Sequence, residues 1–144
     1  MIEWTLPIKL VSEANRKDHW TAKNRRAKII KNAIKAKWLK EHAIVALPCT
    51  ITLTRVSPRH LDSDNLQMAC KSARDQIADL LIPKSKIELL KLNKSGKLKT
   101  CLINFGKSDS DPRLTWIYDQ EKGKPKEYAL KIKIEPTIQD PLIY

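Results

Sequence analysis

Glycine is scarce in this chain, with three among 144 residues. Loops that cradle phosphate groups need several glycines, so the sequence argues against a glycine-rich phosphate loop. Acidic residues are also in the minority, at 16 Asp and Glu against 28 Lys and Arg. Long apolar runs are missing, since none approaches the roughly 18 residues of a membrane-spanning helix. We therefore expect neither a membrane protein nor a classical nucleotide-binding loop.

Cysteine use is low and unpatterned. The three cysteines are Cys49, Cys70 and Cys101. An odd number at wide spacing is no disulfide framework, and without a Cys-x-x-Cys pair a structural zinc site is not expected. We expect reduced, partly buried thiols in a reducing cytoplasm. The early charges of Glu3, Lys9 and Glu13 interrupt the start, so no signal peptide is expected.

The length and charge bound the class of protein. A chain of 144 residues suits one domain, spanning 1–144, and 42% hydrophobic residues can supply a core. The net charge of +12 exceeds the roughly 2–8 that keeps a small domain soluble. Such an excess attracts polyanions, because Lys and Arg displace the counterions of a phosphate backbone. Composition thus favours nucleic-acid binding, while a general polyanion surface and mere solubility remain alternatives.

Periodicity predicts alternating strands and helices in the first half. Apolar residues at every second position predict strands over 2–10 and 49–56. Apolar residues three and four positions apart predict helices over 21–42, with Thr21 as the N-cap, and over 64–81.

Two hairpins are predicted in the second half. The first covers about 86–105 around a turn at 93–96, and the second covers 114–134 around a turn at 123–125. The order strand, helix, strand, helix, hairpin, hairpin predicts an α/β or α+β fold. We expect a mixed sheet with two main helices on one face.

The helix expected at 21–42 is strongly basic. No acidic residue precedes Glu41 in it, so ion pairs within the helix cannot account for its many lysines. A phosphate-contacting helix is favoured over a merely solvated face. The ring of Trp20, just before it, could also stack on an unpaired base, as could that of Trp116, for which core packing is the alternative.

Two acidic pairs stand out against this basic background. Asp62 and Asp64 precede the second helix, and Asp109 and Asp111 repeat the spacing before a strand. Neighbouring carboxylates repel one another unless a cation lies between them, and Mg²⁺ binds through one or two carboxylates plus water and phosphate oxygens. Together with a basic surface, the two pairs favour a phosphodiesterase.

Ordinary structure offers an alternative for each pair. Asp64 or Ser63 could be the N-cap of the second helix, with Asp62 in an Asx turn. The second pair could serve a turn ahead of Pro112.

The segment Asp62-Ser63-Asp64-Asn65-Leu66-Gln67 resembles the Asp-x-Asp-Asn-Leu signature of the RusA family of Holliday junction resolvases. The Asn15-Arg16 loop before the basic helix and the acidic loop at 108–116 are similar too. The resemblance implies a homodimeric endonuclease that uses Mg²⁺, with Mn²⁺ as a substitute, and no small-molecule cofactor. Such enzymes nick four-way DNA junctions symmetrically in recombination and repair, leaving 5′-phosphates, in the cytoplasm of a bacterial or phage-infected cell.

The resemblance also implies the site residues. The catalytic, metal-binding aspartates would be Asp62, Asp64 and Asp109. Asp111 adds a fourth carboxylate to the metal set. The family has a lysine where this chain has Met68, and Lys71 is the candidate to replace it.

DNA contacts are expected from the early loop, the basic helix and the loop before the first acidic motif. They are Asn15, Arg16, Lys23, Arg25, Arg26, Arg59 and His60. Compared with the family, a hairpin at 86–105 is inserted between the acidic motifs, and it would extend the DNA-binding or dimer surface. A non-catalytic nucleic-acid-binding protein on the same fold remains the alternative.

Overall fold

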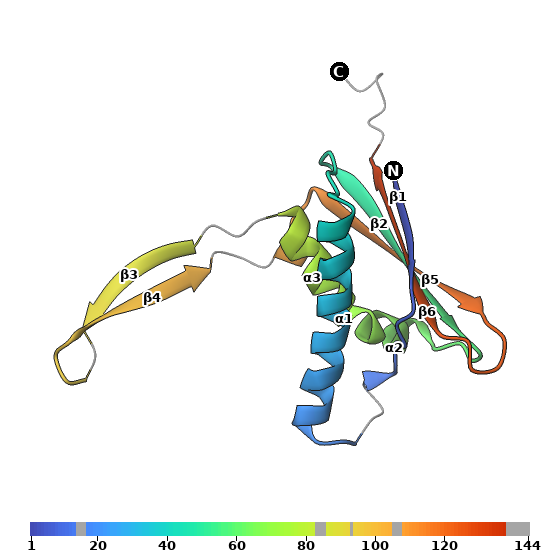
Figure 1. Cartoon of the computed structure of the whole chain (residues 1–144), viewed down its shortest axis with the longest axis horizontal. Helices are drawn as coiled ribbons and strands as arrows, with labels where there is room; N and C mark the ends of the chain where they lie inside the picture. The colour runs from blue at the N-terminus through green and yellow to red at the C-terminus, as the bar shows by residue number, and fades with distance from the viewer. Residues whose placement is uncertain (14–16, 83–85, 93, 105–107, 138–144) are drawn as a thin grey trace.

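The computed structural model describes residues 1–13, 17–82, 86–92, 94–104 and 108–137. Its centre is a four-stranded sheet with the strand order β1-β6-β2-β5. The strands are β1 (Ile2–Leu6), β2 (Cys49–Ser57), β5 (Leu114–Lys122) and β6 (Ala129–Pro136). Strand β6 is antiparallel to both β1 and β2, whereas β5 runs parallel to β2, so the sheet is mixed (Figure 1).

The hairpin predicted over 114–134 is wrong. Strands β5 and β6 both exist, but β2 lies between them and pairs with each. The connection between β5 and β6 passes the end of β2, where the backbone N–H of Gly123 donates to the carbonyl of Ser57 at 2.9 Å. The turn residues of this connection fit a hairpin locally. The pairing is decided instead by the nine-residue, buried β2, which requires a neighbour on each side.

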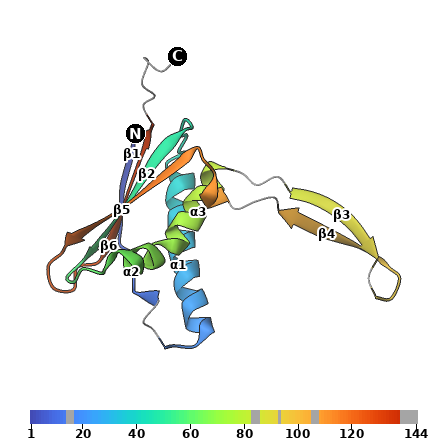
Figure 2. The ribbon, with the colours of Figure 1, turned by 180° about the vertical axis from the view of Figure 1, so that it is seen from behind.

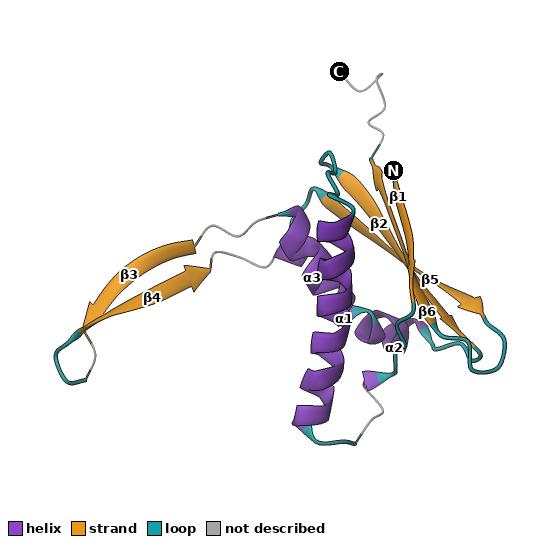
Figure 3. Cartoon of the chain, in the orientation of Figure 1, coloured by secondary structure: helices purple, strands orange, loops and turns teal. Residues whose placement is uncertain are grey.

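Three α-helices in the described chain lie on one face of the sheet, α1 (Trp20–Lys40), α2 (Ser63–Ala69) and α3 (Lys71–Leu81) (Figure 3). This confirms the expected mixed sheet with helices on one face. The most buried side chains come from the sheet, from the segment after β1, from α1 and from the α2–α3 segment. They are Leu10, Ile34, Cys49, Ile51, Leu53, Cys70, Ile77, Leu130, Ile132 and Ile134.

The single helix predicted over 64–81 is broken into α2 and α3. The break falls at Cys70, which ends α2 and precedes α3. The apolar stripe runs through it, so the periodicity gave no sign of a break. Bending lets both halves reach the core, with Leu66 and Ala69 buried from α2 and Ala73 and Ile77 buried from α3.

The first strand and the first helix begin and end differently from the prediction. Strand β1 ends at Leu6, although Ile8 and Leu10 remain buried beyond it. Helix α1 is capped by His19 rather than Thr21. The ring Nδ1 of His19 accepts from the backbone N–H of Thr21 at 3.3 Å and lies 2.8 Å from its hydroxyl oxygen.

A separate two-stranded sheet leaves the body of the molecule between α3 and β5. Strands β3 (Lys86–Leu92) and β4 (Leu98–Asn104) pair antiparallel, as predicted for this segment. They project away from the main sheet and its helices (Figure 2). At their base, the Ser108 hydroxyl in the short helix η2 (Ser108–Ser110) donates to the Ile82 carbonyl at 3.4 Å.

Among the residues described, none of the helices combines the length and the apolar character needed to span a membrane.

Candidate active site

The first acidic pair begins α2. Asp62 is the N-cap, and its Oδ1 accepts from the backbone N–H of Asn65 at 2.9 Å. The cap is therefore Asp62 and neither Asp64 nor Ser63. Asp64 lies in the first turn, and both carboxylates are exposed. A helix N-terminus favours negative charge, so the pair stabilises α2 while it presents carboxylate oxygens to solvent.

The segment before this cap is held by side chains from two strands. The amide of Gln120 on β5 accepts from the Leu61 N–H at 2.8 Å and donates to the Leu61 carbonyl at 2.7 Å. Arg55 on β2 donates to the carbonyls of Arg59 at 2.7 Å and Leu10 at 3.0 Å. Both ends of the 59–61 loop are thus tied to the sheet, which positions Asp62 directly after it.

Arg55 is a buried cation with backbone partners. It is 7% exposed, and its two hydrogen bonds in the described structure go to carbonyl oxygens rather than to a carboxylate. Burial lowers the pKa of its guanidinium below its ordinary value. Arginine nevertheless stays protonated in proteins, so Arg55 adds fixed positive charge beneath this loop.

The second acidic pair starts at Asp109, which faces Arg74 of α3. The Nε of Arg74 lies 3.3 Å from Oδ2 of Asp109, close enough for an ion pair but not aligned as a hydrogen bond. The backbone carbonyl of Asp109 accepts two hydrogen bonds, one from Arg74 at 3.0 Å and one from the indole N–H of Trp116 at 3.1 Å. Arg74 also donates to the Tyr118 hydroxyl at 2.7 Å and lies 5.0 Å from the centre of the Trp116 ring.

Asp111 is engaged by its own neighbour. Its two oxygens accept from the Arg113 guanidinium at 3.0 Å each, and Oδ1 also accepts from the Arg113 backbone N–H at 2.9 Å. These bonds lower the pKa of the Asp111 carboxyl below 3.8. The arrangement is a tight turn before β5, and it gives Asp111 a role that requires no metal ion.

The two acidic pairs approach β5 at different points. Asp62 follows Leu61, which is bonded to Gln120, whereas Asp109 is bonded through its carbonyl to Trp116. Four residues separate these positions along β5, which is about 13 Å at the usual rise of a strand. Within the described ranges, the structure brings together no group of three or more His, Cys, Asp or Glu side chains that could hold a metal ion.

Lys71 is the first residue of α3, directly after the break at Cys70. Its exposed ammonium lies 3.9 Å from Oδ2 of Asp75, one turn along α3. Lys71 therefore does not continue the helix of Asp64, as the single helix predicted over 64–81 would require.

The basic residues divide into two groups. Lys23, Arg25, Arg59 and His60 have exposed side chains. Arg26 differs, since its guanidinium binds Glu13 at 2.6 Å and Asp18 at 2.7 Å. These two carboxylates come from the loop before α1, and they raise the pKa of Arg26.

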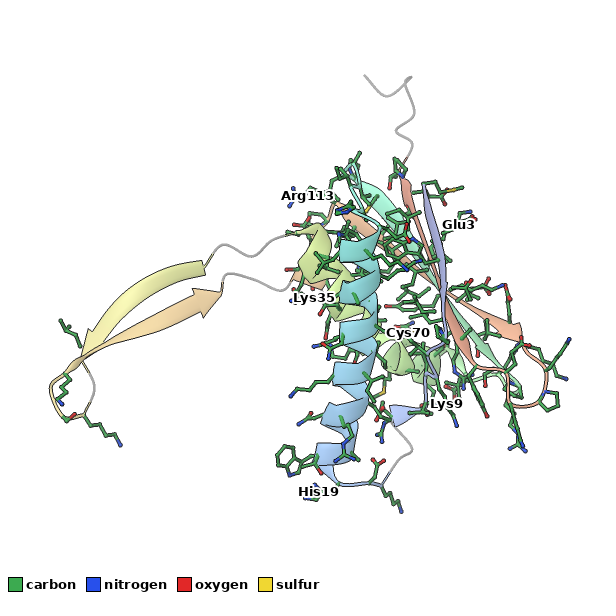
Figure 4. The ribbon with its side chains drawn as sticks, viewed as in Figure 1. Glu3, Lys9, His19, Lys35, Cys70 and Arg113 are labelled. Atoms are coloured by element: carbon green, nitrogen blue, oxygen red, sulfur yellow. The ribbon has the colours of Figure 1, made fainter. Side chains whose placement is uncertain are left out.

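Arg26 therefore fastens that loop to α1 and is not free to contact phosphate. Asn15 and Arg16, also expected to contact DNA, lie outside the described residues. Figure 4 shows His19 at the start of α1 and the exposed Lys35 further along it.

Three residues that shape the site were not predicted from the sequence: Arg55, Arg74 and Gln120. A signal existed for Arg55, because the period of two put it on the same face as Ile51 and Leu53. A charged residue on a buried face requires partners. The partners of Arg74 and Gln120 lie 35 and 59 residues away in sequence, beyond any local pattern.

Comparison of the chain with protein-family models, curated proteins and solved structures found no match.

Proposed function

We propose that the chain is a Mg²⁺-dependent, structure-selective DNA endonuclease that resolves four-way junctions by paired nicks. The observation that carries the proposal is the exposed pair of carboxylates at the start of α2, anchored to the sheet through Leu61. Exposed acids are unusual where a protein of net charge +12 would meet phosphates. A nuclease needs them, because they hold the cation that neutralises the phosphoryl oxygens.

The first acidic pair fits the usual protein donor set of Mg²⁺. Mg²⁺ is commonly held by one or two carboxylates, with water and phosphate oxygens completing its shell. Asp64 and the second oxygen of Asp62 have no hydrogen-bond partner among the described residues, so they can accept the ion. When bound, Mg²⁺ supplies Lewis-acid chemistry for phosphodiester hydrolysis.

In this proposal, Asp109 joins the acidic set only when DNA and the metal ion are bound, because the two pairs contact β5 at positions four residues apart. Its carboxylate faces Arg74, so the guanidinium neutralises it until a cation is present. Lys71 would contribute a positive charge beside the first pair, in exchange for its long contact with Asp75. Asp111 is kept in the proposed metal set only if Arg113 releases it.

The proposed assembly is a homodimer. A four-way junction has two symmetry-related scissile strands, which two active sites on a two-fold axis would match. We place the enzyme in the cytoplasm of a bacterial or phage-infected cell, where branched DNA arises.

A second candidate function is nucleic-acid binding without cleavage. It is favoured by the occupation of Asp109 and Asp111 by Arg74 and Arg113, which needs no metal. In this alternative, the first acidic pair only caps α2. The exposed basic residues of α1 would still bind the phosphate backbone.

Cleavage of labelled DNA distinguishes the two functions. The purified chain is incubated with a four-way junction and with linear duplex of the same sequence, with Mg²⁺, with Mn²⁺ and with chelator. We expect paired nicks in the junction that require the divalent ion, and little cutting of the duplex. Junction binding without nicks under every condition would favour the binding protein, provided that size and folding are normal.

A further inference from the structure

Trp20 is a large aromatic side chain left in solvent. It is the first residue of α1 and is 65% exposed, although the other tryptophans of the described structure contact its core. The ring of His19 lies 5.5 Å away, and a hydrogen-bonding contact with Thr21 fixes that imidazole. The indole is thus restrained on one side, which lowers the entropy cost of ordering it on a ligand.

A surface groove of about 540 Å³ opens beside this indole. The volume is in the range of sites that take small ligands, roughly 300–1,000 Å³. Hydrogen-bonding and basic side chains share its lining with Trp20. They are Thr21, Asn24, Arg25, Lys28 and Lys31.

The positive charge of this groove is uncompensated. Arg25, Lys28 and Lys31 have no acidic partner among the described residues, and the first turn of α1 contains no acid. Two other cations of the same helix are paired, Arg26 with Glu13 and Asp18, and Lys37 with Glu41. The groove therefore offers free cations next to an exposed aromatic ring.

This combination matches the chemistry of an unpaired nucleotide. A base presents a flat π-face that stacks on an aromatic side chain, and its phosphates pair with Lys and Arg. Duplex phosphates alone would need no indole, and an apolar protein partner would need no free cations. We propose that the groove binds one unpaired nucleotide of a DNA strand, with the base on Trp20 and the adjoining phosphates on Arg25 and Lys28. The site deepens the DNA-binding part of the proposed function and does not depend on cleavage.

Binding of matched single strands tests the proposal. The probes are an oligothymidylate of about eight nucleotides and an abasic strand of the same length, which keeps the phosphates and lacks the bases. We expect Trp20→Ala to weaken binding of the oligothymidylate about 5- to 150-fold and to leave binding of the abasic strand unchanged. Trp20→Phe should keep most of the affinity, because a ring remains.

The controls separate stacking from charge and from folding. Arg25→Ala with Lys28→Ala should weaken binding of both strands. Leu39→Ala removes another apolar side chain of α1, 60% exposed and near its far end, and should change neither. An equal loss of both strands with Trp20→Ala, or no loss of either, would overturn the nucleotide site. Because only binding is measured, a chain that never cuts DNA can still support this site, and an active nuclease can still fail it.

Discussion

Gln120 and Leu61 form a two-way contact between β5 and the loop before α2. The amide oxygen of Gln120 accepts from the Leu61 N–H at 2.8 Å, and its amide nitrogen donates to the Leu61 carbonyl at 2.7 Å. The Gln120 side chain thus makes the pair of hydrogen bonds that a neighbouring strand would make, and it satisfies both backbone groups of Leu61. Since Asp62 comes next, the position of the first acidic pair depends on this contact.

Replacing Gln120 by Met tests that dependence. The change removes both hydrogen bonds at similar size, and it should lower the free energy of unfolding by about 1–3 kcal/mol because partly buried backbone groups lose their partners. Junction cleavage should fall further than stability explains. Thr115→Val is the matched control, since Thr115 is exposed on the same strand. Urea unfolding and nicking rates measure the two effects, and a Gln120→Met protein that is fully stable and active would contradict the anchoring role.

Asp62 allows capping and chemistry to be separated. Asn caps a helix about as well as Asp, so Asp62→Asn should keep the free energy of unfolding within about 0.5 kcal/mol, whereas Asp62→Ala should lose about 1 kcal/mol. Cleavage should nevertheless fall about 100-fold or more with Asn, the scale of one lost electrostatic contact to the transition state. Junction binding should persist. If Asp62→Asn cuts at the normal rate, the aspartate is a cap and nothing more.

Asp109 requires a double-mutant cycle because Arg74 faces it. Arg74→Met should cost about 1–3 kcal/mol of stability, since the Tyr118 hydroxyl and the Asp109 carbonyl lose a donor. Tyr118→Phe removes only the hydroxyl bond and should cost less.

The nicking rates of the wild-type protein, the two single variants and the double variant are the measurement in this cycle. We expect Asp109→Asn to reduce nicking in the wild-type protein and again in the Arg74→Met background. If Asp109→Asn does not reduce nicking in the Arg74→Met background, Asp109 acts only through Arg74, and the proposed metal set shrinks to Asp62 and Asp64.

The sequence predicted the features that depend on residues close together in the chain. Alternation in β2 and β6 and the apolar stripe of α1 repeat within a few residues, and side-chain direction follows from that repeat. The Asp-x-Asp motif was correctly placed at the start of a helix for the same reason. The expected pairing of β5 with β6 failed because β2, more than fifty residues earlier, competes for both strands.

The candidate active site shows the same difference between contacts within one element and contacts between elements. We predicted that Arg26 contacts phosphate because no acidic residue lies near it within its helix. Its partners, Glu13 and Asp18, reach it from the preceding loop, 13 and 8 residues away. The break at Cys70 was hidden for another reason, because packing on the sheet and not periodicity decides where a helix bends.

The Asp111–Arg113 contact predicts how stability depends on acid. Arg113 lowers the pKa of Asp111 below 3.8, so the folded protein binds this proton less tightly than the unfolded chain does. The contact therefore adds stability above about pH 4, and that stability is lost as the pH falls through the lowered pKa. Unfolding of wild type and Arg113→Met by urea between about pH 2 and 6 should show a constant difference at the upper end that shrinks at the lower end. Asp111→Asn should show the same shrinking difference from wild type, and a difference independent of pH would contradict the ion pair.

Salt dependence of junction binding should distinguish the exposed cations Lys23 and Arg25 of α1 from the paired Arg26. Each phosphate contact contributes about 0.9 to the slope of log affinity against log salt for duplex DNA. Lys23→Ala with Arg25→Ala should therefore reduce the slope by up to about 1.8. Arg26→Met should leave the slope unchanged and destabilise the protein, because Arg26 binds Glu13 and Asp18.

Loss of charge alone must be excluded as the cause of a smaller slope. Lys131→Ala with Lys133→Ala removes two positive charges from β6, on the sheet face opposite the buried Ile132, where Lys131 is paired with Glu121 and Lys133 with Glu135. This control should lower affinity slightly through the weaker field and keep the slope. If both double variants reduce the slope equally, α1 makes no special contact with the phosphates, and its basic residues are an ordinary solvated helix face.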